Sequence, residues 1–177
     1  MKALSSMPPH EEFPPKVSLV VDASVFLNFA FVRRLDQFLS WFKNLGVTLI
    51  VVDEVLSVSK KKSVFGPPLD LQSYVKKDLL QIEEMDSDEE TIKFYGYANQ
   101  EFSGVIFHSG ESSCLAVALV KQYGLLCDER MVLDEFKKEK KFDAPAWTSR
   151  DVVRLACKSG LIKKEIELEI MTGFSYQ

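Results

Sequence analysis

Short apolar runs alternate along the chain with longer segments in which apolar residues recur at helical spacing. Residues 17–21 and 47–52 are mostly apolar and rich in β-branched side chains, and residues 125–127 form a third, shorter run. Such runs are typical of strands that are buried on both faces of a parallel sheet. Less regular segments near 79–82 and 142–147 predict two further strands.

The segments between these runs have apolar residues three and four positions apart, which predicts helices. The expected helices cover residues 23–31, 35–45, 54–59, 91–102, 110–123, 131–141, 150–159 and 162–171, with a short one beginning near residue 69. Gly46, Gly124 and Gly160 each follow one of them and are expected to end it, as glycine does at helix C-termini. Strands that alternate with helices predict an α/β fold whose parallel sheet is covered on both faces.

The composition fits one globular domain. The chain has 177 residues, of which 46% are hydrophobic and 27% charged, and its thirteen Phe supply bulk for a core. Residues 1–16 contain four prolines and predict an extended leader that need not pack, with residues 17–177 as the domain. The longest mainly apolar stretch, 17–32, is interrupted by Asp22 and Asn28, so no membrane span is expected.

The three cysteines, Cys114, Cys127 and Cys157, lie in apolar sequence, and their spacing matches no zinc motif. An odd number of such residues favours reduced, partly buried thiols in a cytoplasmic protein. The formal net charge of −4 argues against binding nucleic acid by bulk charge alone. Any such binding must rest on metal ions or on local basic patches, of which Lys60, Lys61 and Lys62 form one. A solvated surface is the simpler explanation of that patch.

Acidic residues cluster where the predicted strands end. Asp22 and Asp128 directly follow strands, Asp53 and Glu54 follow another, and Glu111 lies in the first turn of the helix before the Asp128 strand. In an open parallel sheet the carboxyl ends of the strands share one edge, where ligands bind. Carboxylates gathered there repel one another unless a cation such as Mg²⁺ or Mn²⁺ neutralises them. Each acid taken singly could instead cap a helix or interact favourably with the positive end of a helix dipole.

Three segments resemble the motifs of one protein family. Residues 20–27 resemble the opening strand and turn of PIN-domain proteins, and residues 110–118 followed by 125–130 are similar to their third and fourth acidic motifs. Residues 154–162 resemble the tail of a toxin-like bacterial and archaeal subgroup. The resemblance to the PIN-domain family runs from about residue 17 to 162, and the ordered set of motifs is its specific part.

The resemblance implies a three-layer α/β/α fold with a central, mostly parallel sheet and an endoribonuclease activity that depends on Mg²⁺ or Mn²⁺. By position, Asp22, Glu111 and Asp128 take the places of the family's metal-site acids. Ser24 matches the hydroxyl residue after the first acid, and Glu129 matches an acid found beside the last one.

The second acid of the family falls by spacing near Val58, which is apolar. Glu54 lies four positions earlier, on the same face of a helix, and could substitute for it. The apolar residue at position 58 also fits a catalytic site that has been weakened. Glu54 is therefore a candidate catalytic residue, and a weakened site is the alternative.

Three functions follow as expectations. The first is a metal-dependent ribonuclease in which Lys60, Lys61 and Lys62 contact RNA; the resemblance adds a small antitoxin or a second copy as a partner. The second is a catalytically weakened PIN-like module that binds RNA or protein. The third, a phosphoacceptor receiver domain, requires an acidic pair after the first strand and a lysine after the fifth, and the chain has a single Asp22 and Trp147-Thr148 there.

Overall fold

The computed structural model describes residues 13–99 and 106–174. Its sheet consists of β1 (Leu19–Val21), β2 (Leu45–Val47), β3 (Gln81–Ile82), β4 (Gly124–Leu126) and β5 (Ala146–Trp147). Every pairing is parallel, and the strands lie in the order β3-β2-β1-β4-β5. The strand order therefore reverses at β1, which lies between β2 and β4. Receiver domains place the first strand between the second and the third, so this order excludes that alternative.

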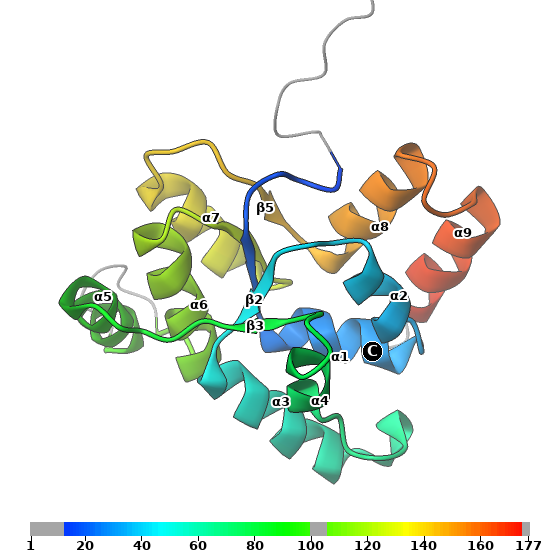
Figure 1. Cartoon of the computed structure of the whole chain (residues 1–177), viewed down its shortest axis with the longest axis horizontal. Coiled ribbons are helices and arrows are strands. Elements are labelled where there is room, and N and C mark those ends of the chain that lie inside the picture. The colour runs from blue at the N-terminus through cyan, green and yellow to red at the C-terminus, as the bar shows by residue number, and fades with distance from the viewer. Residues whose placement is uncertain (1–12, 100–105, 175–177) are drawn as a thin grey trace, which may run out of the picture.

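Helices cover both faces of the sheet. They are α1 (Ala23–Phe31), α2 (Leu35–Ser40), α3 (Leu49–Lys61), α4 (Leu71–Val75), α5 (Asp88–Ala98), α6 (Ser109–Val120), α7 (Arg130–Glu139), α8 (Ser149–Lys158) and α9 (Lys164–Gly173), with a 3-10 turn, η2 (Ser63–Phe65). In Figure 1, α5, α6 and α7 lie on one side of the strands and α1, α2, α8 and α9 on the other. Helix α3 contacts both α1 and α6 at the end of the sheet. The expected three-layer α/β/α fold with a parallel sheet is confirmed.

Polar residues at the helix starts explain several element boundaries. Thr48 caps α3 by accepting a hydrogen bond from the Val51 amide, and Ser87 caps α5 by accepting one from the Glu90 amide. Such caps satisfy amides that have no partner within the helix. Gly160 follows α8 with φ of +79°, a left-handed conformation that favours glycine, so the expected stop at Gly160 is confirmed.

The strand expected at residues 47–52 is wrong. Strand β2 spans Leu45–Val47, and helix α3 begins at Leu49, directly after its cap Thr48. An apolar run of this length fits a buried strand or a buried helix face equally well, and Val51, Val52 and Val55 are buried at helical spacing. Gly46 lies inside β2 and ends no helix, since α2 ends at Ser40. Asp53 and Glu54 consequently lie within α3.

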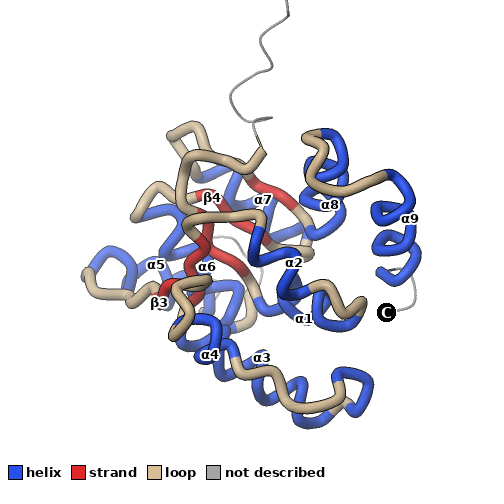
Figure 2. Tube along the Cα trace, turned by 45° about the vertical axis from the view of Figure 1, so that its right-hand side comes forward, coloured by secondary structure: helices blue, strands red, loops and turns tan. Residues whose placement is uncertain are grey.

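Strands β1, β2 and β4 are completely buried, and aromatic side chains fill the layer beside them. Phe29 stacks on Phe38 with ring centroids 4.3 Å apart, and Phe174 contacts Phe29 edge-on at 5.4 Å. Figure 2 shows the strands enclosed by helices. Phe13 packs edge-on against Phe42 at 5.3 Å. The end of the expected leader therefore does pack, while residues 1–12 lie outside the described residues.

Within the described ranges, no helix combines the length and the apolar character that crossing a membrane requires.

Candidate active site

Asp22 and Asp128 lie side by side at the carboxyl ends of the two central strands. The Asp22 amide donates to Leu126 O at 2.9 Å, which holds the end of β1 against β4. The Ser24 hydroxyl donates to Asp22 Oδ2 at 2.6 Å and accepts from the Asp128 amide at 3.2 Å. Ser24 therefore joins the two segments that carry the predicted acids, at the point where the strand order reverses and where α/β proteins bind ligands.

Glu111 and Glu54 approach the same edge from two helices. Glu111 is the third residue of α6, and its Oε2 accepts a hydrogen bond from the His108 amide at 2.8 Å. Glu54 comes from the second turn of α3, and its Oε2 lies so close to Gly110 that a Cβ at position 110 would collide with it. Glycine at position 110 therefore makes room for the Glu54 carboxylate.

The charge of Asp22 acts on the carboxyl groups of both Glu54 and Glu111. Burial raises the pKa of Glu54, and the charges of Asp22 and Glu111 raise it further, while His108 lowers it. Burial likewise raises the pKa of Glu111, against the hydrogen bond from the His108 amide, and Asp22 and Glu129 add to the rise. A like charge close to a half-buried carboxyl group disfavours the ionised form of that group. Asp22, Glu54 and Glu111 therefore form one group of interacting charges.

The buried Cys127 thiol is affected by the charge of Asp128 as well as by the charges of Asp22 and Glu111. Burial is the main cause that raises the pKa of the Cys127 thiol, and Asp22, Glu111 and Asp128 all raise it further. The charges of the three acids that the sequence analysis singled out thus all act on one buried thiol. Cys114 and Cys127 are buried free thiols and Cys157 is a half-buried one, as expected.

Two polar residues that the sequence analysis missed hold the Asp128 side chain. Asn28 Nδ2 donates to Asp128 Oδ2 at 2.6 Å, and the Ser149 amide donates to Asp128 Oδ1 at 2.7 Å. The Ser149 hydroxyl donates to Oδ2 as well. Asn28 belongs to α1 and Ser149 is the first residue of α8, so Asp128 ties both helices to the end of β4. The one signal in the sequence was Asn28 itself, a polar residue inside an apolar stretch.

The structural roles weighed for the single acids hold in part. Asp22 caps α1, because its Oδ2 accepts a hydrogen bond from the Ser24 amide at 3.1 Å, and Glu111 binds the amide ahead of α6. Asp128 does not cap α7, whose N-cap position is Glu129. Among the described residues, Asp22 Oδ1 and Glu111 Oε1 receive no hydrogen bond, and Glu54 receives none at either oxygen. These atoms remain available to a ligand.

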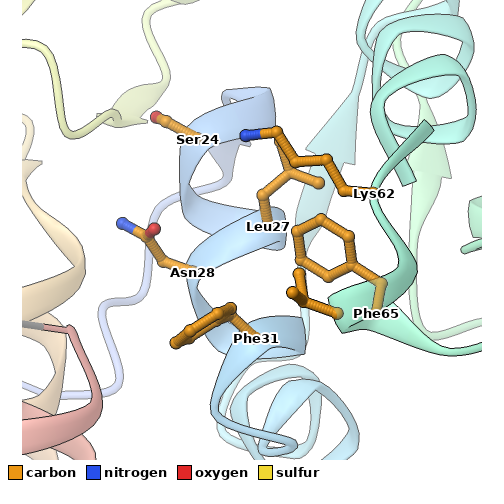
Figure 3. A pocket seen from close by; sticks show the side chains of 7 residues that line it. Ser24, Leu27, Asn28, Phe31, Lys62 and Phe65 are labelled. Atoms are coloured by element: carbon orange, nitrogen blue, oxygen red, sulfur yellow. The ribbon is translucent and has the colours of Figure 1, made fainter. Parts of the chain in front are cut away.

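The remaining candidate residues lie around this centre. Glu129 is exposed and lines a pocket of about 190 Å³ together with His108 and Glu111. Lys60 and Lys61 are exposed in the last turn of α3. Lys62 follows them and lines a second pocket, of about 230 Å³, that also includes Ser24 (Figure 3).

The topology has a counterpart among solved structures. The crystal structure of PAE2754 from Pyrobaculum aerophilum, a PIN-domain protein, superimposes with a TM-score of 0.51 at 21% sequence identity, covering 80% of this chain and 98% of that one. This chain has a PIN-type fold. The match extends over nearly the whole of PAE2754, so the PIN-type fold accounts for the sheet and for the helices that carry the acids. At this level of identity the likeness concerns the fold alone.

Two further structures are similar to the PIN-type fold of this chain at lower scores. A toxin-antitoxin complex from Klebsiella pneumoniae has a TM-score of 0.45, 18% identity, and coverage of 63% of this chain and 87% of that one. VapBC2 from Rickettsia felis, bound to a DNA fragment from its promoter, has a TM-score of 0.44, 15% identity, and coverage of 73% and 98%. Both scores are too low to support a statement about this chain. No protein-family model and no curated protein matches the sequence.

The donor set of this PIN-type fold suits a hard divalent cation by its chemistry. Oxygen ligands from Asp and Glu are those that Mg²⁺ and Mn²⁺ prefer, and the raised pKa values of Glu54 and Glu111 mark a cluster that a cation would stabilise. Within residues 13–99 and 106–174, however, no three His, Cys, Asp or Glu side chains are already arranged around a common metal position. Binding a cation would require the carboxylates to draw together.

Replacing Glu54 by Gln should stabilise the metal-free protein at neutral pH. A carboxyl whose pKa is raised on folding supplies stability below its unfolded pKa, near 4.5, and that stability is lost as the pH rises through the folded value. In EDTA at pH 7, Glu54→Gln should raise the melting temperature by a few degrees at most, because solvent screens this half-buried site. The gain should shrink toward pH 4.

Asp53→Asn is the matched control, since Asp53 is the exposed neighbour of Glu54 on the same helix. Thermal unfolding followed by circular dichroism across this pH range measures both variants. A Glu54→Gln protein that melts below the wild type throughout would show that the folded protein does not disfavour the ionised Glu54 carboxylate.

Proposed function

We propose that this protein is a metal-dependent ribonuclease that hydrolyses phosphodiester bonds at the carboxyl edge of its sheet. The feature that supports this most directly is the approach of the half-buried Glu54 and Glu111 to the buried Asp22, whose charge adds to the rise in pKa that burial causes in both glutamates. Burying like charges together is unfavourable in a purely structural role, whereas a divalent cation makes the arrangement favourable. The PIN-type fold is consistent with this activity and does not by itself establish it.

In this proposal Asp22, Glu111 and Asp128 hold a Mg²⁺ or Mn²⁺ ion, and Glu129 contributes from the rim. Such an ion neutralises charge on the phosphate group and lowers the pKa of water. Ser24 fixes Asp22 Oδ2 in place, which leaves Oδ1 for the ligand. Asn28 and Ser149 fix Asp128, whose two oxygens can each accept more than one bond.

Glu54 is the residue best suited to handle a proton. Its carboxylate is half-buried, receives no hydrogen bond from the described residues, and has a raised pKa. A general base works best when its pKa approaches the working pH. Glu54 would take the proton from the attacking water as the water oxygen bonds to phosphorus, and the leaving ester oxygen would take a proton from solvent.

The second candidate is a weakened module that binds RNA or protein without cutting. The observation that favours it is the absence, in the described part of the chain, of three acids already arranged around a metal position. In addition, the PIN-domain resemblance places an acid near Val58. Glu54, which could substitute for it, lies one helical turn earlier on α3.

Partner proteins belong to the proposal as well. A small antitoxin or a second copy of the chain would cover exposed apolar side chains such as Val64, 57% exposed after α3, and Leu168, 57% exposed on α9. Burying side chains of this kind is a main source of affinity between proteins.

The decisive measurement is cleavage of a labelled single-stranded RNA with and without Mn²⁺. We expect cleavage in Mn²⁺ that EDTA abolishes, together with thermal stabilisation by Mn²⁺ of about 5–10 °C at a hundredfold excess over its Kd. Asp128→Asn should lose that stabilisation, while Asp53→Asn, on the exposed side of α3, should keep it. Cleavage that persists in EDTA contradicts the metal mechanism, and RNA binding without cleavage under any metal supports the weakened module.

A further inference from the structure

The pocket beside the acidic centre has a lining that the proposed reaction does not use. It has a volume of about 230 Å³ and is lined by Ser24, Leu27, Asn28, Phe31, Lys62, Val64 and Phe65. Two of these residues touch the acidic centre directly: Ser24 binds Asp22, and Asn28 binds Asp128. A ligand in this pocket would therefore lie next to the acids.

Figure 3 shows how the other walls are arranged. The Lys62 side chain extends from the end of α3 across Leu27, and its ammonium points toward the Ser24 end of α1. Phe31, in the last turn of α1, lies at the opposite end, and Phe65 projects from η2 between them. The pocket thus has a cation at the end near the acids and aromatic rings farther away.

These side chains are available to a ligand. Lys62 is exposed, and in the part of the chain that the structure describes it has no ion-pair partner. Phe31 and Phe65 are each half-buried, and neither ring is stacked on another aromatic ring of the described residues. A free cation and open aromatic faces in one pocket match a ligand that carries both a negative charge and a flat ring.

The volume of the pocket limits the size of the ligand that it can bind. Pockets that enclose a whole drug-sized ligand have volumes of roughly 300–1,000 Å³, so this one fits a single ring system from a longer molecule. Aromatic side chains stack on unpaired bases of any sequence, and lysines hold the backbone phosphates. We propose that this pocket binds one unpaired nucleotide of a single-stranded RNA, with the base on Phe65 and Phe31 and its phosphate at Lys62.

This inference rests on the proposed function, because the bound nucleotide would neighbour the bond that is cut. It assigns base stacking to Phe31 and Phe65. It also assigns phosphate binding to Lys62 in particular, and not to Lys60 or Lys61. It also predicts a preference for single strands, since a base held in a duplex cannot enter the pocket.

The test measures binding without cleavage, by fluorescence anisotropy of a labelled ten-nucleotide RNA in EDTA. Phe65→Leu keeps apolar bulk but loses the aromatic face, and should weaken binding by about fivefold, the lower end of the range for one stacked base. Phe65→Tyr should restore it. Tyr95→Ala is the control, since Tyr95 is an aromatic residue on α5 that is 57% exposed and lines neither pocket described above.

Lys62→Gln should act differently from Phe65→Leu. Losing one phosphate contact to a single strand should lower the slope of log affinity against log salt concentration by about 0.7, whereas Phe65→Leu should leave the slope unchanged. Lys76→Gln removes the same charge at an exposed position directly after α4, outside the pocket. It should leave the slope nearly as in the wild type.

The outcomes separate this inference from the proposed function. If the wild type binds RNA and cleaves it in Mn²⁺, but Phe65→Leu and Lys62→Gln bind as the wild type does, the pocket assignment is wrong and the ribonuclease stands. If the wild type neither binds nor cleaves RNA, both fail. If Phe65→Leu instead converts a dimer to a monomer in light scattering, the pocket is a self-association surface and the nucleotide assignment is wrong.

Discussion

Asp22→Asn is expected to lower Mn²⁺-dependent RNA cleavage about a thousandfold while the protein remains folded. A metal ion supplies several kcal/mol of transition-state stabilisation, and roughly 4 kcal/mol corresponds to three powers of ten in rate. The substitution removes the negative charge from the residue that raises the pKa of both Glu54 and Glu111. Single-turnover cleavage at saturating Mn²⁺ measures the effect.

The fold should survive this substitution because the structural role of Asp22 needs only an oxygen acceptor. Its Oδ2 accepts from the Ser24 amide and from the Ser24 hydroxyl, and an Asn side chain offers one such oxygen and is a good helix cap. Asp53→Asn removes a charge from an exposed position of α3 and should cleave as the wild type does. Unchanged cleavage by Asp22→Asn would exclude Asp22 from the reaction.

Gly110→Ala should lower the cleavage rate at least about a hundredfold without reducing stability. The added methyl group collides with Glu54 Oε2 and meets Val51 Cγ2 only at 3.6 Å, an ordinary contact. The flexible Glu54 side chain can turn away, which relieves the collision but withdraws the proposed base, and general base catalysis contributes roughly 10²–10⁴-fold. Alanine also favours the helix by about 0.5–1 kcal/mol relative to glycine.

A double-variant cycle tests whether Gly110 acts through Glu54. Glu54→Gln already removes the base, so adding Gly110→Ala to it should cost little further activity. Rates of the four proteins, with urea unfolding of each, complete the measurement. If the two losses multiply, Gly110 acts through another part of α6, and the close approach of Glu54 does not explain its presence.

The sequence predicted those parts of the site that follow directly from strand ends and helix starts. Asp22 and Asp128 follow central strands, and Glu111 lies in the first turn of α6, so their positions depend on local pattern and on a parallel sheet. Glu54 was found from the spacing of residues on a helix, although the strand before that helix was predicted to begin two residues and to end five residues too late. The apolar run after Thr48 could not be assigned by periodicity, and the capping bond of Thr48 settled it.

The residues that the sequence did not reveal depend on contacts between distant segments. Asn28 meets Asp128 across 100 positions of the chain, and Ser149 meets it across 21. Phe31 and Phe65 come together only because η2 folds back beside α1, and each looks like an ordinary core residue in the sequence. No local pattern marks such pairs, since they arise from packing.

The bridge that Ser24 makes between Asp22 and the Asp128 amide restricts what this hydroxyl can offer to RNA. A serine has one proton to give, and here the Asp22 carboxylate takes it. Phosphate oxygens only accept hydrogen bonds. The Ser24 hydroxyl therefore cannot bind one while it donates its proton to Asp22 Oδ2. In the proposed ribonuclease, a ribose 2′-hydroxyl would donate its own proton to the unused lone pair of the Ser24 oxygen. This position would then distinguish the sugar of RNA from that of DNA without binding a backbone phosphate.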